Sequence, residues 1–137
     1  MPYTDLVAKK IGQCDGRTVW ELDRDLEWMN GVTKIIVPKG FQCDFCSVPR
    51  LPLVWLMVGA IGEVAGTVHD FLYREPDEGY VETINRKQAD LIFYNILGEE
   101  GVSWWKRKAM YYVVRTCAGK NWHARKVNEP FLEGYTL

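Results

Sequence analysis

The stretch EVAGTVHDFLY, residues 63–73, marks the point at which the chain changes from β-type to helical sequence. Its apolar side chains recur three and four residues apart, which is the spacing of one face of an α-helix. These side chains are Val64, Val68, Phe71 and Leu72. Pro76 and Gly79 follow, and residues of both types end helices. The pattern therefore predicts a helix from about Glu63 to Tyr73.

A second helix is predicted from Arg86 to Leu97. Apolar residues follow the i, i+3, i+4, i+7 spacing of a helix that buries one face. The members of this stripe are Ala89, Ile92, Phe93, Ile96 and Leu97. Gly98 and Gly101 are expected to end the helix.

A third helix is predicted to begin after Ser103, which can cap it, and to continue through Arg115. Its predicted apolar face consists of Trp105, Ala109, Tyr112, Val113 and Thr116. A run of basic residues falls mostly outside this face, as expected for a solvated surface. The run is Lys106, Arg107 and Lys108. Gly119 closes the helix, and the tail to Leu137 is expected to be irregular or to form a short strand.

Upstream of the helices, the first third of the chain is of β type. Residues 18–22 favour a strand because they are rich in β-branched and aromatic side chains. Leu26 and Trp28 then alternate with residues of the opposite face, as in a half-buried strand. Asn30-Gly31 is a strong signal for a hairpin turn before a further strand at 32–37. We expect a small antiparallel β-meander.

Together these patterns predict one α+β domain over residues 1–137, with an N-terminal antiparallel β-meander followed by a three-helix segment. The composition agrees, because 47% hydrophobic and 13% aromatic residues suffice for a packed core and exclude a disordered chain. The net charge of -1 gives no electrostatic reason to expect a nucleic-acid partner.

Targeting segments are not expected in this chain. Residues 1–12 lack the apolar region of a secretory signal peptide. The longest apolar run, residues 51–62, is shorter than the roughly 18 residues that cross a bilayer, so no transmembrane segment is predicted. Without a signal peptide, the cysteines, including the C-x-x-C pair Cys43 and Cys46, are expected to be reduced thiols.

The first candidate site consists of His69, Tyr73 and Asp90. His69 and Tyr73 share one helix face, and Asp90 lies at the edge of the apolar stripe of the next helix. A buried carboxylate needs a partner, so these side chains are expected to meet if the two helices pack antiparallel. An aspartate bound to one imidazole nitrogen leaves the other nitrogen as a general base for catalysis. A purely structural hydrogen-bonded pair is the alternative.

A second set of polar side chains surrounds the loop of residues 40–50. Asp70 points about a quarter turn away from the first set, toward this loop, where it can bind a hard cation through oxygen. Asp44 is a second candidate metal ligand. Ser47 is interpreted as a turn residue rather than a nucleophile, because no G-x-S-x-G motif surrounds it. Arg50 can pair with an aspartate or clamp a phosphate or carboxylate of a substrate.

The motif His-Asp-x-x-Tyr on one helix with Ala-Asp on the next resembles the core of phospholipase A2 enzymes, especially the small domain of parvoviral capsid proteins. The matching residues are His69, Asp70, Tyr73, Ala89 and Asp90. The resemblance implies that His69 activates water and that Asp90 with Tyr73 orients it. It also implies that Asp70 binds calcium, so the expected cofactor is calcium or none, and the expected substrate is a phospholipid ester.

A broader resemblance covers nearly the whole chain. The matching segments are WEL (20–22), VPKGF (37–41), SVPR (47–50) and HDFLY (69–73), with Arg86 and Ala89-Asp90. They are similar to an uncharacterised family of bacteriophage and prophage proteins, domain of unknown function 1353. This resemblance implies a phage gene product in the host cytoplasm or the virion. It marks Asp44, Ser47, Arg50, His69, Asp70 and Asp90 as the residues to test.

These observations leave three functions open. The first is a small hydrolase of ester bonds that acts on phospholipid. The second is a phage head, tail or host-takeover protein that binds other phage or host proteins, with a structural polar cluster. The third is a binder of nucleotides or other small molecules that uses Arg50 and the basic run of the third helix.

Overall fold

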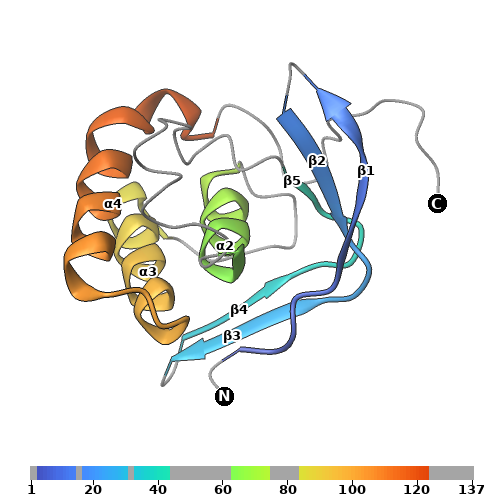
Figure 1. The fold of residues 1–137 in the computed structure, drawn as a ribbon, viewed down its shortest axis with the longest axis horizontal. Helices are drawn as coiled ribbons and strands as arrows, with labels where there is room; N and C mark the ends of the chain where they lie inside the picture. Colours follow the sequence, from blue (N-terminus) through green and yellow to red (C-terminus); the bar gives the residue numbers. More distant parts are fainter. Residues whose placement is uncertain (1–2, 15–16, 31–32, 44–62, 75–83, 124–137) are drawn as a thin grey trace. The chain divides into compact units, whose positions relative to one another are not determined.

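The computed structural model describes residues 3–14, 17–30, 33–43, 63–74 and 84–123 (Figure 1). The chain divides into two compact units, residues 1–44 with 128–137 and residues 45–127. The described strands belong to the first unit and the described α-helices to the second. This order confirms the predicted α+β class, in which antiparallel strands precede three helices. The single-domain organisation stays a prediction.

The β unit contains two hydrogen-bonded sheets among its described residues. The strands are β1 (Ala8–Cys14), β2 (Arg17–Leu22), β3 (Leu26–Asn30), β4 (Thr33–Val37) and β5 (Gln42–Cys43). β2 pairs antiparallel with both β1 and β5, whereas β3 and β4 form a separate antiparallel hairpin. The strands that the sequence predicts therefore correspond to β2, β3 and β4.

Two features of the β unit differ from a simple meander. The sequence of β1 has only a weak preference for β structure, so its pairing with β2 is what stabilises this strand. The register of that pairing shifts between Lys10 and Gly12. β2 pairs with β5 rather than with β3. The chain returns through Gly40, whose φ of 89° suits glycine, and the Gly40 N–H donates to the Leu22 carbonyl at 2.9 Å.

The β3–β4 hairpin follows the period of two that its sequence predicts. Leu26 and Trp28 are buried opposite their cross-strand partners Val37 and Ile35. Met29, which lies between the buried positions, is 54% exposed. One face of this hairpin therefore contributes to the core.

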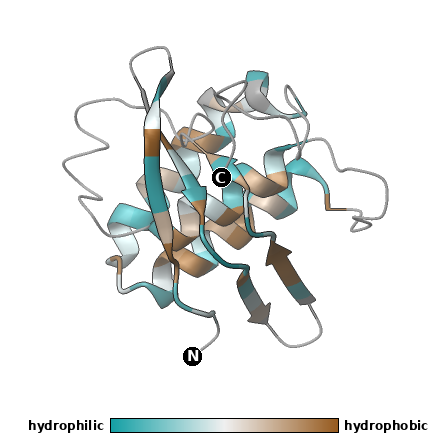
Figure 2. Ribbon diagram, turned by 90° about the vertical axis from the view of Figure 1, so that its right-hand side faces the viewer, coloured by the Kyte–Doolittle hydropathy of each residue, from teal (hydrophilic) through white to brown (hydrophobic). Residues whose placement is uncertain are grey.

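The helical unit contains α2 (Glu63–Tyr73), α3 (Arg86–Glu99), α4 (Trp104–Cys117) and the short 3-10 helix η1 (Gly119–Asn121). α3 packs against both α2 and α4 (Figure 1). Figure 2 shows hydrophobic and hydrophilic residues on each of the helices, as expected for amphipathic elements. The described part of the chain has no helix long and apolar enough to cross a membrane.

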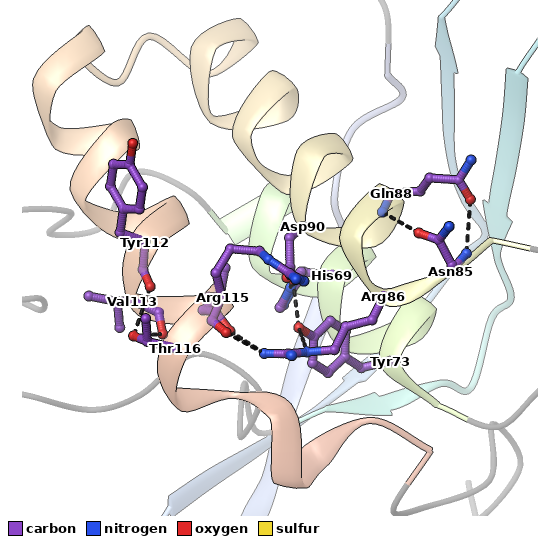
Figure 3. A network of polar contacts seen from close by, with 11 residues as sticks. His69, Tyr73, Asn85, Arg86, Gln88, Asp90, Tyr112, Val113, Arg115 and Thr116 are labelled. Atoms are coloured by element: carbon purple, nitrogen blue, oxygen red, sulfur yellow. Dashed lines mark hydrogen bonds and ion pairs between the residues drawn. The ribbon is translucent and has the colours of Figure 1, made fainter.

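The first turn of α3 is fixed by a capping box. The Asn85 side chain accepts a hydrogen bond from the Gln88 backbone at 2.8 Å, and the Gln88 side chain accepts one from the Asn85 backbone at 2.9 Å. Two donors that the helix leaves unpaired are thereby satisfied. The box sets the start of the helix that carries Arg86 and Asp90 (Figure 3).

Gly98 does not end α3, contrary to the sequence prediction. It lies inside the helix, where an added Cβ would collide with the guanidinium of Arg107. Gly101, with a φ of 91°, is the residue that reverses the chain after the helix ends at Glu99. Gly98 therefore lies inside α3 with the guanidinium of Arg107 from α4 against it.

The buried face of α4 also differs from the prediction. Met110 and Val114 are buried, whereas Trp105 and Tyr112 of the predicted face are 51% and 64% exposed. α4 carries apolar residues around much of its circumference, so periodicity alone does not select the aliphatic face over the aromatic one. The predicted face was wrong, and the solvent side of α4 carries aromatic rings.

Candidate functional site

The structure brings His69 and Tyr73 of α2 together with Asp90 of α3 (Figure 3). His69 Nε2 lies 2.7 Å from Asp90 Oδ1, and the Tyr73 hydroxyl donates a hydrogen bond of 2.6 Å to the same oxygen. His69 and Asp90 have no exposed surface, and Tyr73 is buried. The centroid of the His69 ring lies 4.2 Å from that of Tyr73 and 4.7 Å from that of Phe93. The polar cluster is thus enclosed by aromatic rings.

Two arginines extend this cluster to α4. Arg115 donates from Nη1 to Asp90 Oδ2 at 2.8 Å, so both oxygens of the carboxylate are engaged. Arg86 donates from Nε to the Tyr73 hydroxyl at 3.1 Å. Its Nη2 donates to the carbonyls of Val114 and Arg115 at 2.9 and 2.8 Å. The network therefore joins all three helices (Figure 3).

Arg115 is a member of the cluster that sequence reasoning missed. The sequence offers Arg50 as a partner for an aspartate, and Arg50 lies outside the described residues. The sequence does contain an indication that Arg115 pairs with Asp90. A buried carboxylate needs a cation or a hydrogen-bond donor, and Arg115 is a basic residue in the last turn of a neighbouring helix. The choice among basic residues requires knowledge of how α3 and α4 pack.

The segment after α4, for which the sequence predicts irregular structure or a short strand, also reaches this cluster. η1 places Trp122 against Tyr73, with ring centroids 5.2 Å apart in an edge-to-face arrangement. The His123 N–H donates to the Tyr73 carbonyl at 2.7 Å. The residues that follow α4 thus pack against the end of α2.

Burial and hydrogen bonding set the protonation states of the cluster. Burial lowers the pKa of His69 and outweighs the opposite effect of Asp90. Burial, the largest single effect, would raise the pKa of Asp90, but hydrogen bonds from His69, Tyr73 and Arg115 outweigh it and hold this pKa below its ordinary value. Burial, followed by the bond to Asp90, raises the pKa of Tyr73. At neutral pH the cluster therefore holds a neutral imidazole, an ionised carboxylate and a neutral phenol.

The free energy of unfolding is expected to fall on acidification from about pH 6.5 downward. Because the pKa of His69 is lowered in the fold, the unfolded chain binds a proton in this range that the folded chain does not bind. Below about pH 3.9, Asp90 adds a loss of the same sign, since its pKa is also lowered in the fold. Urea denaturation at a series of pH values measures this dependence.

The two histidines of the chain provide a matched control for this prediction. His69→Gln should flatten the dependence between about pH 6.5 and 4.5. His123→Gln, at an exposed position, should leave it in place. A wild-type stability that rises as the pH falls through this range would contradict a neutral, buried His69.

Asp70 forms an ion pair with a cation supplied by its own chain. Its Oδ2 lies 3.3 Å from Nη2 of Arg74, and both side chains are buried. The residues that the structure describes contain no group of three or more His, Cys, Asp or Glu able to hold a metal ion. A calcium ion needs six to eight oxygen ligands, so a carboxylate paired with an arginine does not by itself fit one.

The other predicted loop residues cannot be placed in relation to this pair. Asp44, Ser47 and Arg50 lie outside the described residues. Calcium binding by Asp70 with Asp44, the turn at Ser47 in the loop beside the candidate site, and substrate binding by Arg50 therefore stay predictions.

Glu100 positions the helix that carries His69. Its two carboxylate oxygens accept hydrogen bonds from the backbone N–H groups of Val64, at 3.1 Å, and Ala65, at 2.7 Å. These N–H groups belong to the first turn of α2, where a helix leaves its donors unpaired and where its dipole favours an anion. A residue just after α3 thus caps α2 from outside that helix.

Glu100→Ala is expected to lower the free energy of unfolding by about 1–2 kcal/mol, because both donors lose their acceptor. Glu100→Gln keeps one acceptor oxygen and removes the charge, so its loss should be smaller. Chemical denaturation of the wild type and the two variants measures both effects. Changes within about 0.5 kcal/mol for Glu100→Ala, the range of ordinary surface substitutions, would contradict the capping role.

Fold and site define a class of protein: an α+β protein whose helical unit encloses a His–Asp–Tyr cluster, braced by two arginines. Residues 20–114 match a family model described as "Protein of unknown function (DUF1353)", and the chain belongs to this family. The match includes the three clustered residues on α2 and α3.

A relative from Sinorhizobium fredii (strain NBRC 101917 / NGR234), described as "Uncharacterized protein y4jT", is 33% identical over 132 residues. The alignment covers 89% of this chain and 36% of the relative, so the chain spans about a third of that protein's length. No solved structure matches the chain.

Proposed function

We propose that the protein is a small hydrolase of ester bonds in which His69 is the general base, with Asp90 and Tyr73 as its positioning residues. The observation that carries this proposal is the shared acceptor Asp90 Oδ1, which lies 2.7 Å from His69 Nε2 and 2.6 Å from the Tyr73 hydroxyl. An ionised carboxylate accepts but does not donate, so its contact assigns the imidazole hydrogen to Nε2. The lone pair of the neutral ring then lies on Nδ1, the nitrogen that accepts a proton in catalysis.

The proposed reaction begins when Nδ1 of His69 takes a proton from a water molecule whose oxygen attacks the ester carbonyl carbon. The ring becomes an imidazolium, and the ionised Asp90 stabilises this charge. When the tetrahedral intermediate collapses, the carbon–oxygen bond to the alcohol breaks and the imidazolium returns its proton to the departing oxygen. The products are a carboxylic acid and an alcohol, and no step passes through a metal ion.

The burial of His69 sets a condition on this mechanism. Because the side chain has no exposed surface, a substrate carbonyl reaches Nδ1 only when neighbouring groups move aside. The proposed enzyme is therefore expected to turn over slowly unless a substrate or surface favours the open form.

Phospholipid is the substrate that we propose, because the placement of His69, Tyr73 and Asp90 agrees with the roles that the resemblance to phospholipase A2 enzymes implies. A bacteriophage or prophage origin is proposed on the broader resemblance alone. The family description and the relative's name assign no activity.

Hydrolysis of phospholipid vesicles tests the proposal. The wild type should release fatty acid faster than buffer alone, and His69→Ala should not. The assay is run with added calcium and with a chelator to decide whether a cation takes part in the reaction. Among the described residues, the ion pair of Asp70 with Arg74 argues against a bound cation at Asp70. Equal background release in every arm would rule out the hydrolase.

A second candidate function is a non-enzymatic phage protein, either a head or tail component or a host-takeover factor. The observation that favours it is the absence of exposed surface on both His69 and Asp90, which suits a polar cluster that only stabilises the helices. Mass spectrometry of purified virions tests the structural version. Absence of the chain from virions would leave a host-takeover role in the cytoplasm.

A further inference from the structure

The solvent-facing side of α4 is unusually aromatic for an exposed helix face. Trp104, Trp105 and Tyr112 are 63%, 51% and 64% exposed. Successive residues of a helix are about 100° apart, so these three rings share one side with Lys108, opposite the buried Met110. We call Trp104, Trp105, Lys108 and Tyr112 the α4 face. Lys106 lies about 100° further round the helix than Trp105 and joins this face through its ammonium group, which lies over the Trp105 ring. Exposed apolar side chains that cluster in this way mark an interaction site.

The α4 face is also positively charged. α4 contains Lys106, Arg107, Lys108 and Arg115 and no acidic residue. Arg115 is bound to Asp90, and Arg107 lies over the ring of Tyr94 with 4.9 Å to the centroid. The two lysines carry the charge of the face.

Each lysine of the face lies near a tryptophan. Lys106 Nζ is 5.6 Å from the Trp105 ring centroid, and Lys108 Nζ is 5.7 Å from that of Trp104. The face therefore combines amphipathic rings with ammonium groups at its N-terminal end.

We propose that the α4 face docks on an anionic phospholipid bilayer. Tryptophan and tyrosine rings prefer the headgroup level of a bilayer, and lysines beside them are attracted to lipid phosphates. A second copy of this chain fits less well, because lysine is depleted from protein interfaces. Nucleic acid fits less well too, because two lysines neutralise few phosphates. This docking does not depend on the proposed hydrolysis.

Flotation with vesicles tests the docking. The full chain should float with vesicles of phosphatidylcholine and phosphatidylglycerol, less with phosphatidylcholine alone, and less as salt is raised. The double variant Lys106→Gln, Lys108→Gln should weaken binding about 30-fold. The double variant Trp104→Ala, Trp105→Ala should weaken it about 100-fold, or about tenfold for each ring withdrawn from the headgroup region.

Matched variants elsewhere keep this test specific. Lys120→Gln removes an exposed lysine beyond the other end of α4, and Met29→Ala removes an equally exposed apolar side chain from β3. Both should bind vesicles as the wild type does. Because the four lysine and tryptophan positions are half-buried or exposed, the variants should keep wild-type stability in urea.

Three results would overturn the docking. The first is absence of vesicle binding by the wild type, or binding that the α4 variants do not weaken. The second is a dimer in sedimentation that these variants convert to a monomer, which would assign the face to a second copy. The third is retention on single-stranded DNA without vesicle binding, lost in the same variants. Vesicle binding without lipid hydrolysis would support the docking and count only against the proposed hydrolase.

Discussion

Replacing Asp90 with alanine is expected to lower the free energy of unfolding by about 3–5 kcal/mol, because a buried carboxylate that serves several donors is lost. Asp90 Oδ1 accepts from His69 and Tyr73, and Oδ2 accepts from Arg115. In the variant, His69 and Tyr73 lose Asp90 as their shared acceptor while they stay packed among aromatic rings, and Arg115 keeps only partial access to water. Such a loss is a large share of the roughly 5–15 kcal/mol that stabilises a typical domain.

Chemical denaturation measures this effect, with the slope compared between variants to detect changes in the unfolded state. Asp90→Asn keeps the shape and one acceptor but removes the charge, so an intermediate loss is expected. Asn95→Ala, at an exposed position of the same helix, is the matched control and should stay within about 0.5 kcal/mol. A loss below about 1 kcal/mol for Asp90→Ala would mean that the cluster contributes little beyond packing.

The predictable part of this site depends on geometry within single helices. His69 and Tyr73 are four residues apart, so any helix through them presents both to the same neighbour. Asp90 sits at the edge of an apolar stripe, so packing of that stripe buries it. The meeting of the three side chains could therefore be predicted from the sequence on one condition, which is that α2 and α3 pack against each other.

The unpredicted part depends on how separate elements pack. The bond between Arg115 and Asp90 requires the register of α3 against α4, which periodicity does not supply. The same limit applies to β5, which pairs with β2 across an intervening hairpin. The pair of Asp70 on α2 and Arg74 just after it is different, because an acid and a base four residues apart can be recognised in the sequence without knowledge of the packing.

The structure buries a different face of α4 from the predicted one, and the difference has a physical reason. Periodicity ranks apolar positions by spacing, and the set containing Trp105 and Tyr112 satisfies it. The core instead takes Met110 and Val114, aliphatic side chains that lie four residues apart and pack closely. Large aromatic rings that stay outside a core are typical of binding surfaces. The wrongly predicted residues Trp105 and Tyr112 therefore belong to the proposed docking face.

Replacing His69 with alanine is expected to lower the rate of phospholipid hydrolysis by about 10²–10⁴-fold, the usual contribution of a general base. The measurement is fatty-acid release from anionic vesicles at saturating substrate, at the pH optimum and below it. In the wild type the rate should fall only below about pH 6.5, because burial lowers the pKa of His69 and the base stays neutral down to that range. Tyr73→Phe keeps the base and removes one donor to Asp90, so its rate should fall less.

Loss of rate alone does not separate a chemical role from a structural one, because removing a buried imidazole also removes packing against Phe93. His69→Gln retains a polar side chain able to donate to Asp90, so it should fold better than His69→Ala while still lacking a base. If His69→Gln is folded at the assay temperature and inactive, the imidazole is needed for chemistry. If it keeps the wild-type rate, or if the rate follows the fraction folded across the variants, the cluster is a stabilising element only.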